Sequence, residues 1–418
     1  MSRTYKLKEI AILKTGPFGT QFKASEYVAE GIPVINVKNI GYGNLYYEDL
    51  DFITEKTRDR LSEHILQTGD IVFGRKGSVD RHCLITEKEN GWFQGSDCLR
   101  VRITDTSVNP QYVSYYLLSS HVLKSINNAA VGSTMASINM DIIGDIKILL
   151  PAYEEQCRIA TTLRKLDDKR AVNSAINDNL QQMAKTIYDY WFTQFDFPNE
   201  DGKPYRSSGG QMVWNDELKR EIPVGWSSAS IVKNSLSTVI KPGVDFFGRK
   251  EYLATAEVNG TSISTGSIVE YATRESRANM QPTVNSVWFA KMKNSVKHLY
   301  LNAEMQPLID STILSTGFCG IQCTELSFEF IASFIESSYF ETIKDILAHG
   351  ATQEAVNNED MDAIRFAVPT DNILTKYHEA TRGMYAQISK NICENRKLTA
   401  LRDWLLPMLM NGQATVND

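Results

Sequence analysis

The chain of 418 residues lacks several features that mark common classes of protein. Basic residues are not in excess, because 44 lysines and arginines stand against 50 aspartates and glutamates; this excludes a globally basic nucleic-acid binder but not a local basic surface. No apolar run approaches the roughly 20 residues of a membrane span, and the first residues contain no apolar secretory segment. Six cysteines in a chain of this length indicate reduced thiols rather than a disulfide framework. We therefore expect a soluble, cytoplasmic protein with no membrane partner.

Familiar catalytic motifs are missing as well. There is no Gly-x-x-x-x-Gly-Lys-Ser/Thr phosphate loop, no His-Glu-x-x-His zinc motif, no Gly-x-Ser-x-Gly elbow and no Pro-Pro pair. Cys319 and Cys323 form a close pair, but no further zinc ligands follow at suitable spacing, so core thiols are the better interpretation. His82 and Cys83 are adjacent and would point in opposite directions on a strand, which argues against a nucleophile. The chain is predicted to be a non-catalytic binding protein that holds no metal or cofactor itself.

The sequence repeats itself at a fixed offset of 218 residues. Residues 132–151 and 350–369 align without a gap, and five of their 20 positions are identical. Each copy reads as a loop of small residues, a short helical turn and a strand that ends at proline, Pro151 or Pro369. A repeat of this kind predicts two similar globular heads.

A long helical pattern follows each copy of the repeat. Apolar residues recur at spacings of four and three, as in the seam of a coiled coil, so the two helices are expected to pack on each other. Asn173 and Asn391 coincide under the same offset, at or near the seam; a buried pair would fix the helix register, and a solvated polar position is the equally open alternative. The predicted seam residues are Leu163, Leu166, Ile176, Leu180, Met183, Ile187, Met384, Ile388, Leu398, Leu401 and Leu405.

The predicted fold is α+β, with two similar mixed α/β heads joined by two long, mutually packed antiparallel helices in a pseudo-two-fold repeat. Each helix would span about 60 Å at ~1.5 Å per residue. The expected divisions are residues 1–152 for the first head, 153–197 for the central helix, 198–224 for a linker, 225–370 for the second head and 371–418 for the C-terminal helix.

Contacts with double-stranded DNA would have to come from local clusters, because no segment of domain size is strongly basic. In the first head, the loop Gly74–Arg81 follows an apolar strand; its glycines let the backbone approach a phosphate, and Arg75 has the alternative of a bidentate contact with guanine. Each such loop is otherwise an ordinary solvated turn. The candidate DNA-binding residues of the first head are Thr20, Gln21, Lys23, Lys38, Asn39, Arg75, Lys76, Ser78, Arg81, Ser133 and Thr134.

The second head offers a matching but weaker set. Basic residues gather in 274–279 and 291–298, a glycine-containing segment follows at 316–320, and residues 351–353 repeat 133–135. Each signal is weak alone, but both heads present one, which favours a DNA-binding role for these loops. The candidates are Arg274, Ser276, Arg277, Lys291, Lys293, Lys297, Thr316, Thr352 and Gln353.

Seven motifs follow one another around the two helical patterns: Gly69-Asp-Ile-Val-Phe-Gly-Arg-Lys-Gly-Ser78, the repeat at 132–151, Tyr153-Glu-Glu-Gln156, Trp191-Phe-x-x-Phe-Asp-Phe197, Ile222-Pro-Val-Gly-Trp226, Ser276-Arg-Ala278 and Ser315-Thr-Gly-Phe318. With these motifs in this order, the chain resembles, over essentially its full length, the specificity subunit of type I restriction–modification systems. A departure lies in the second repeat, where Asp371-Asn-Ile-Leu374 stands in place of the expected Glu-Gln.

The resemblance implies that each head is a target recognition domain that reads one half of an asymmetric, bipartite DNA site. The helices would set the gap between the half-sites and dock two modification subunits, which bind S-adenosylmethionine and methylate adenine. Restriction subunits, where recruited, would bring ATP- and Mg-dependent translocation and cleavage. The chain itself would perform no chemistry.

Two other functions remain open from the residues alone. The main alternative is a two-headed protein-interaction scaffold, which would bind DNA only nonspecifically. The other is a nuclease, because Asp201 and Glu217-Leu-Lys219 faintly resemble metal-binding carboxylates, although they lie in a segment rich in turn formers. Magnesium-dependent cutting by the isolated chain would be needed to support the nuclease.

Overall fold

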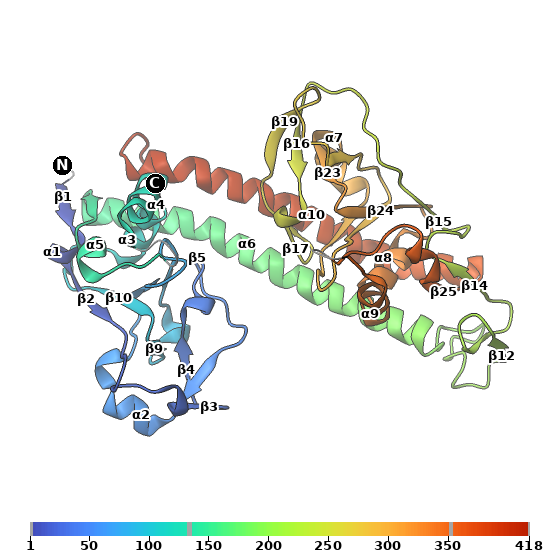
Figure 1. Ribbon diagram of the computed structural model, residues 1–418, viewed down its shortest axis with the longest axis horizontal. Coiled ribbons are helices and arrows are strands. Elements are labelled where there is room, and N and C mark those ends of the chain that lie inside the picture. The colour runs from blue at the N-terminus through green and yellow to red at the C-terminus, as the bar shows by residue number, and fades with distance from the viewer. Residues whose placement is uncertain (1–2, 132–135, 351–353, 417–418) are drawn as a thin grey trace. The chain divides into compact units, whose positions relative to one another are not determined.

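The structure is a computed structural model that describes residues 3–131, 136–350 and 354–416. It divides into two compact units, a first unit of residues 1–168 and 399–418 and a second unit of residues 169–398 (Figure 1). Each unit takes part of both long helices, α6 (Tyr153–Tyr188) and α10 (Asp371–Met410). This division differs from the expected separation of heads and helices, because helix residues complete the hydrophobic core of each unit.

The first unit contains two sheets and a strand pair. Its strands are β1 (Arg3–Lys6), β2 (Ala11–Thr15), β3 (Tyr27–Val28), β4 (Ile32–Ile35), β5 (Tyr42–Gly43), β6 (Asp51–Ile53), β7 (Ile71–Gly74), β8 (His82–Leu84), β9 (Phe93–Gln94), β10 (Cys98–Ile103) and β11 (Lys147–Leu150), and its shorter helices are α1 (Leu7–Ile10), α2 (Glu55–Arg60), α3 (Pro110–Leu117), α4 (Ser120–Ala129) and α5 (Met140–Gly144). The sheet orders are β2-β10-β7-β8-β5 and β3-β6-β4-β9. β1 pairs antiparallel with β11, the strand that leads into α6.

Local sequence accounts for the junction between the sheets and the helices of the first unit. α3 begins with Pro110 in its first turn and is capped by the Asn109 side chain, which accepts from two backbone amides. The buried Gln156 then fastens the start of α6 to this cap: its Oε1 accepts from the Asn109 amide (2.9 Å), and its Nε2 donates to the Pro151 carbonyl (2.9 Å). The start of α6 is thus held by these two hydrogen bonds of the Gln156 side chain to the backbone rather than by helix propensity alone.

The second unit has the same kind of construction. Its strands are β12 (Met212–Asn215), β13 (Arg220–Pro223), β14 (Ser227–Ser230), β15 (Ser237–Val239), β16 (Arg249–Leu253), β17 (Val258–Asn259), β18 (Ser262–Ile263), β19 (Ser267–Glu270), β20 (Ala278–Met280), β21 (Ser286–Ala290), β22 (His298–Leu301), β23 (Thr312–Ser315), β24 (Phe318–Cys323) and β25 (Arg365–Val368), and its shorter helices are α7 (Gln306–Ser311), α8 (Phe328–Glu336) and α9 (Ser338–Leu347). The two main sheets are β15-β24-β21-β22 and β19-β16-β23-β20, and β14 pairs with β25 as β1 does with β11.

The internal repeat is present in the positions of the elements. α8, α9, β25 and α10 begin 218 residues after α3, α4, β11 and α6, respectively. The strand orders β2-β10-β7-β8 and β15-β24-β21-β22 also correspond. The predicted α+β class, the repeat and the two long packed helices are confirmed. No helix in the described part of the chain is long and apolar enough to cross a bilayer.

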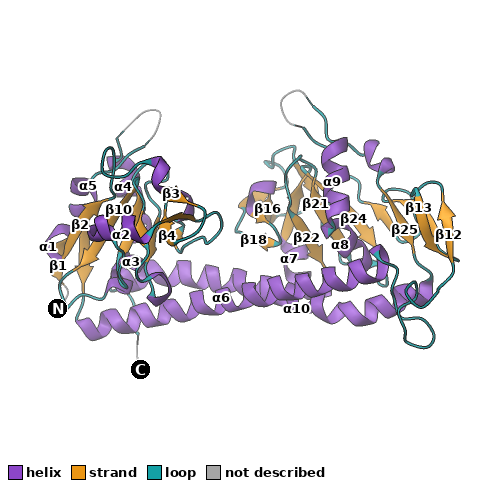
Figure 2. Cartoon of the chain, turned by 90° about the horizontal axis from the view of Figure 1, so that it is seen from below, coloured by secondary structure: helices purple, strands orange, loops and turns teal. Residues whose placement is uncertain are grey.

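The two long helices pack antiparallel within each unit, and the sheets of each unit lie to one side of them (Figure 2). In the first unit the start of α6 meets the end of α10, where Leu163 and Leu406 are buried in one core cluster. In the second unit the end of α6 meets the start of α10, where Tyr188 and Tyr377 share another. The C-terminal helix therefore contributes to the cores of both units.

Part of the predicted seam lies elsewhere. Ile176, Met183 and Leu401 are 39%, 51% and 42% exposed, so the prediction that they belong to the interface is wrong. A strict seven-residue repeat drifts by about 20° per heptad on a straight helix, and neighbouring residues such as Ala184 and Leu406 occupy the interface instead. The buried predicted residues are Leu163 and Ile388, and the partly buried ones are Leu166, Leu180, Ile187, Met384, Leu398 and Leu405.

Asparagines occupy the middle of the helix interface. Asn173 and Asn391 are 1% and 3% exposed, so the buried alternative is correct, and Asn177 joins them at 6%. The Asn391 Nδ2 donates to the Asn177 Oδ1 (2.8 Å), and the Asn173 Nδ2 donates to the Glu394 carboxylate (2.7 Å). Because any axial slip would leave these amides buried without partners, they fix the register of α6 against α10.

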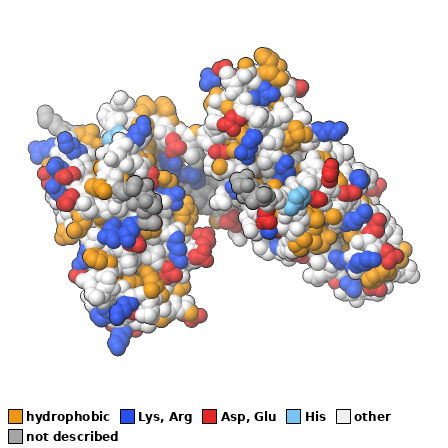
Figure 3. All heavy atoms as spheres, in the orientation of Figure 1, with side chains coloured by type: hydrophobic (Ala, Val, Ile, Leu, Met, Phe, Trp, Pro, Cys, Tyr) orange, Lys and Arg blue, Asp and Glu red, His pale blue; other side chains and the backbone are white. Residues whose placement is uncertain are grey.

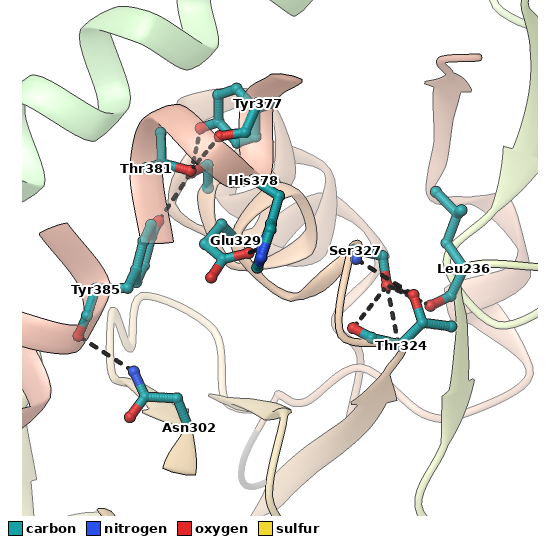
Figure 4. A network of polar contacts seen from close by, with 10 residues as sticks. Leu236, Asn302, Thr324, Ser327, Glu329, Tyr377, His378, Thr381 and Tyr385 are labelled. Atoms are coloured by element: carbon teal, nitrogen blue, oxygen red, sulfur yellow. Dashed lines mark hydrogen bonds and ion pairs between the residues drawn. The ribbon is translucent and has the colours of Figure 1, made fainter. Parts of the chain in front are cut away.

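A second polar network fastens α10 to the second unit (Figure 4). The Ser333 hydroxyl on α8 lies 2.8 Å from the phenol oxygens of both Tyr377 and Tyr385, and the His378 Nδ1 contacts the Glu329 carboxylate at 2.7 Å. Burial raises the pKa of Glu329, and its hydrogen bond to His378 opposes that shift. In the first unit the start of α6 is held by hydrogen bonds of Gln156. The residue at the same place in α10 is Leu374, which packs into the hydrophobic core of the second unit. This difference gives a structural reason why residues 371–374 lack the Glu-Gln pair.

Candidate nucleic-acid interface

In the first unit the basic loop that follows β7 is joined to the repeated loop. The Gly77 amide donates to the Ala136 carbonyl (2.9 Å), and the Ile138 amide donates to the Arg75 carbonyl (3.0 Å). Gly77 has a φ of 76°, a conformation that glycine adopts without strain. The loop therefore has a defined backbone, and the repeated segment lies directly against the predicted DNA-binding arginine.

One carboxylate holds two of the three basic side chains of this loop. Asp97 accepts from the Arg75 Nη2 at 3.4 Å and from the Lys76 Nζ at 3.0 Å, while the Arg75 amide donates to the Asp97 carbonyl at 2.7 Å. Among the described residues, the Nε groups of Arg75 and Arg81 have no hydrogen-bond acceptor. These Nε atoms are buried, so they are not themselves accessible to a ligand.

Two aromatic rings flank these arginines. The Arg75 guanidinium lies 5.7 Å from the centre of the Phe18 ring, and the Arg81 guanidinium lies 5.4 Å from that of Tyr42. Phe18 and Tyr42 are both exposed, and the Tyr42 hydroxyl donates to Asp80 (3.1 Å). The predicted candidates did not include these rings, although the glycine bracket around Phe18 was a usable signal.

The other candidates of the first unit vary in accessibility. Thr20, Gln21 and Lys23 are exposed, and Ser78 is partly exposed. Lys38 is exposed and forms an ion pair with Asp51 (3.0 Å). Asn39 is fully buried, and its Nδ2 donates to the Glu48 carbonyl (3.0 Å), so the prediction that it contacts DNA is wrong; it stabilises its own turn. Ser133 and Thr134 lie outside the described residues.

The second unit repeats the same juxtaposition. The loop after β21 is joined to the second repeated loop, because the Lys293 amide donates to the Glu354 carbonyl (3.0 Å) and the Val356 amide donates to the Lys291 carbonyl (3.0 Å). β7 and β21 hold the same place in their sheets, beside β10 and β24. A basic hairpin loop therefore lies against the repeated loop in both units. Thr352 and Gln353 lie outside the described residues.

Further candidates of the second unit come together from three segments. The Thr316 amide donates to the Arg277 carbonyl (2.8 Å), and the Lys291 amide donates to the Gly317 carbonyl (3.0 Å). Ser276 and Arg277 are exposed, and Thr316 is partly exposed. These backbone hydrogen bonds bring the segments around residues 277, 291 and 316 next to one another.

The side chains of the remaining basic candidates are held by contacts within the chain. The Arg274 guanidinium donates to the Ala278 carbonyl (3.2 Å) and lies 4.0 Å from the centre of the Tyr271 ring. The Lys293 Nζ forms an ion pair with Glu354 (2.8 Å). The Lys297 Nζ donates to the Thr255 carbonyl (2.5 Å), which favours a structural role for this lysine.

Charge on the surface is local rather than broad. On the face drawn in Figure 3, basic and acidic side chains alternate over each unit. This agrees with the excess of acidic residues in the chain and means that any contact with a polyanion depends on a few placed side chains.

The residues weighed for catalysis are occupied otherwise. His82 is fully buried, which lowers its pKa to about 4, and its Nε2 contacts the Ser114 carbonyl at 3.0 Å. Burial raises the pKa of the Cys319 thiol to about 12. Glu217 accepts from Arg365 (2.6 Å) and from the Ser228 hydroxyl. Among the described residues, no group of three or more His, Cys, Asp or Glu side chains is arranged to hold a metal ion.

Comparison with known proteins places this arrangement in context. The family model described as "Type I restriction modification DNA specificity domain" matches residues 2–182. The MjaIX specificity subunit of Methanocaldococcus jannaschii is 25% identical over 99% of this chain and 93% of its own length, and the HindI specificity subunit of Haemophilus influenzae is 20% identical over 83% and 87%. The crystal structure of the S subunit from M. genitalium shares the fold, with a TM-score of 0.56 at 14% identity over 98% of this chain and 96% of that chain.

Proposed function

We propose that this chain is a specificity subunit of a type I restriction–modification system, as its similarity to such subunits suggests, and that its two units each read one half of a bipartite DNA site. The observation that carries this proposal is the basic hairpin loop joined to the repeated loop in both units. Arg75 and Lys76 in one unit and Lys291 and Arg277 in the other supply the side chains that contact phosphates and base edges. The two sets differ in sequence, so the half-sites differ and the site is asymmetric.

The long helices set the gap between the half-sites. α6 and α10 contain 36 and 40 residues, which correspond to roughly 54 and 60 Å at ~1.5 Å per residue. Two major-groove segments one turn apart are separated by about 34 Å, which a helix of this length can bridge. The buried asparagine contacts keep the helices from sliding, so the gap is fixed.

Exposed apolar residues on the helices provide surfaces for other subunits. Val172 and Met183 on α6 are 54% and 51% exposed, and Trp404 on α10 is 60% exposed. We propose that these faces dock two modification subunits, which supply S-adenosylmethionine and methylate adenine within each half-site. Restriction subunits that join the complex supply ATP- and Mg-dependent cleavage, and this chain performs no chemistry itself.

The test is methylation sequencing of DNA from cells that express this chain with its modification subunit. We expect methylated adenines in a bipartite motif with a fixed gap. Replacing Arg75 and Lys76 by alanine is expected to relax or abolish one half of the motif and leave the other half unchanged. A stable complex that methylates no defined motif would instead favour an interaction scaffold and contradict the proposal.

A further inference from the structure

Two exposed phenylalanines lie in the loops that follow corresponding strands of the two units. Phe18 follows β2 and Phe246 follows β15, and these strands lie at the same edge of corresponding sheets, beside β10 and β24. The rings are 57% and 82% exposed. A single exposed apolar residue on a surface needs no explanation, but the same residue type in corresponding loops of two units whose sequences otherwise differ does.

Each ring is carried on an anchored loop. Phe22 and Phe247, further along the same loops, are buried at 5% and 8%. Gly16 at the start of the first loop packs so closely that an added Cβ would lie 1.9 Å from the Gly95 carbonyl oxygen, so this position accepts only glycine. The backbone therefore holds the exposed Phe18 ring away from the core rather than leaving it free to fold back.

An arginine contacts the Phe18 ring directly, whereas Phe246 is linked to an arginine only through Tyr271. The Arg75 guanidinium lies 5.7 Å from the centre of the Phe18 ring. Phe246 packs against Tyr271 at 5.3 Å between ring centres, and Tyr271 in turn lies 4.0 Å from the Arg274 guanidinium. Arginine is the side chain that most often contacts guanine in the major groove, and a phenyl ring matches the 5-methyl group of thymine there.

The groove beside Phe246 suits base edges better than phosphates. Its volume is about 400 Å³, and it is lined by Phe246 together with Lys250, Gln281, Thr283 and the carboxylates of Asp245 and Asp310. Asp310 accepts from the Gln306 amide (2.7 Å). Carboxylates repel a phosphate, whereas amides, hydroxyls and carboxylates together match the donors and acceptors of bases.

We propose that Phe18 and Phe246 are specificity-determining residues, each in contact with the 5-methyl group of a thymine in the major groove of its half-site. This inference rests on the proposed function, because it assumes that each unit reads DNA. The thymine methyl is exposed in the major groove, so the contact discriminates thymine from cytosine and from uracil.

The experiment removes the methyl group from the DNA and the ring from the protein. The reconstituted complex of this chain with its modification subunits is titrated with cognate duplexes in which each thymine is replaced in turn by deoxyuridine. We expect the wild type to lose about fourfold in affinity at one thymine of each half-site, the effect of one buried methyl group. Phe18→Ala is expected to abolish that loss in one half-site, and Phe246→Ala in the other.

Controls separate this contact from other effects. Trp214→Ala removes an aromatic ring of comparable exposure (57%) from the β12 strand and is expected to leave both uracil effects unchanged. Phe18→Leu keeps an apolar side chain and is expected to keep part of the discrimination. Equal losses for thymine and uracil DNA on Phe18→Ala, or a smaller salt dependence of binding, would overturn the proposal, since the latter marks a phosphate contact. If the wild-type complex prefers no DNA sequence at all, the proposed function fails first.

Discussion

The contact between Asn177 and Asn391 predicts a specific coupling between the two long helices. The Asn391 Nδ2 donates to the Asn177 Oδ1 at 2.8 Å, and both residues are nearly inaccessible to solvent. Asn177→Ala leaves the Asn391 amide buried without that acceptor, which should lower the free energy of unfolding by about 1–3 kcal/mol. Replacing both asparagines by leucine removes the donor and the acceptor together, so we expect stability within ~1 kcal/mol of the wild type.

Urea unfolding followed by helical circular dichroism measures these differences, with the urea dependence of each variant compared to confirm similar unfolding. A double-mutant cycle of the wild type, Asn177→Leu, Asn391→Leu and the leucine pair should give a coupling energy of about 1–3 kcal/mol between positions 177 and 391. The leucine pair should also loosen the register, so that methylation sequencing shows more than one gap length. A coupling energy near zero, or a single unchanged gap in the leucine pair, would refute the assignment of these amides as the register lock.

Further predictions concern the loops, the helix junction, the helix length and pH. Arg75→Ala should weaken DNA binding with relaxed sequence preference if Arg75 contacts a base, or uniformly with a salt slope smaller by about one unit if it contacts a phosphate; no change in either quantity would remove Arg75 from the interface. Gln156→Leu copies the second unit's Leu374 but orphans the Asn109 amide and the Pro151 carbonyl, so it should lower the melting temperature and cost about 1–3 kcal/mol. Four residues inserted in α6 add about 6 Å and should widen the methylated gap by about two base pairs without changing the half-sites; altered half-sites would contradict the spacer role. Burial raises the pKa of Glu336 to about 7, so the folded chain binds more protons than the unfolded chain between about pH 4.5 and 7. The free energy of unfolding should therefore fall as the pH rises through that window. Glu336→Gln should make this fall smaller, which a plot of melting temperature against pH would measure.

The sequence was sufficient to predict the architecture wherever a pattern was periodic or repeated. The offset of 218 residues predicted two units, and four pairs of elements begin at that offset. The buried state of Asn391 was one of two open alternatives, because helical spacing places a residue on a face but does not say whether a partner covers that face. Covering residues come from the other helix, and only the packed structure shows the Asn177 side chain opposite.

Individual site residues were harder to predict than the fold. Asn39 looked like a surface amide, yet its side chain satisfies the backbone of its own turn, a role that residue type alone does not distinguish from a DNA contact. Ile176 and Met183 match a seven-residue repeat in the sequence but lie outside the helix interface. A straight helix has 3.6 residues per turn, so positions in a strict seven-residue repeat drift around the helix. Phe18 and Tyr42 were not predicted, because a basic cluster in the sequence does not indicate which aromatic rings lie beside it; the structure places these exposed rings beside Arg75 and Arg81.

The composition of the first unit from both ends of the sequence has a consequence for biosynthesis. Leu406, Leu409 and Met410 complete its core, but they leave the ribosome only after the whole second unit has been made. At about 5–20 residues per second, the 230 residues of the second unit take on the order of 10–50 s to synthesise. During that interval the first unit exposes the apolar surface that α10 later covers. A nascent chain interrupted before residue 399 would carry that surface permanently, and it would be a substrate for chaperones and proteases rather than a competitor for the modification subunits.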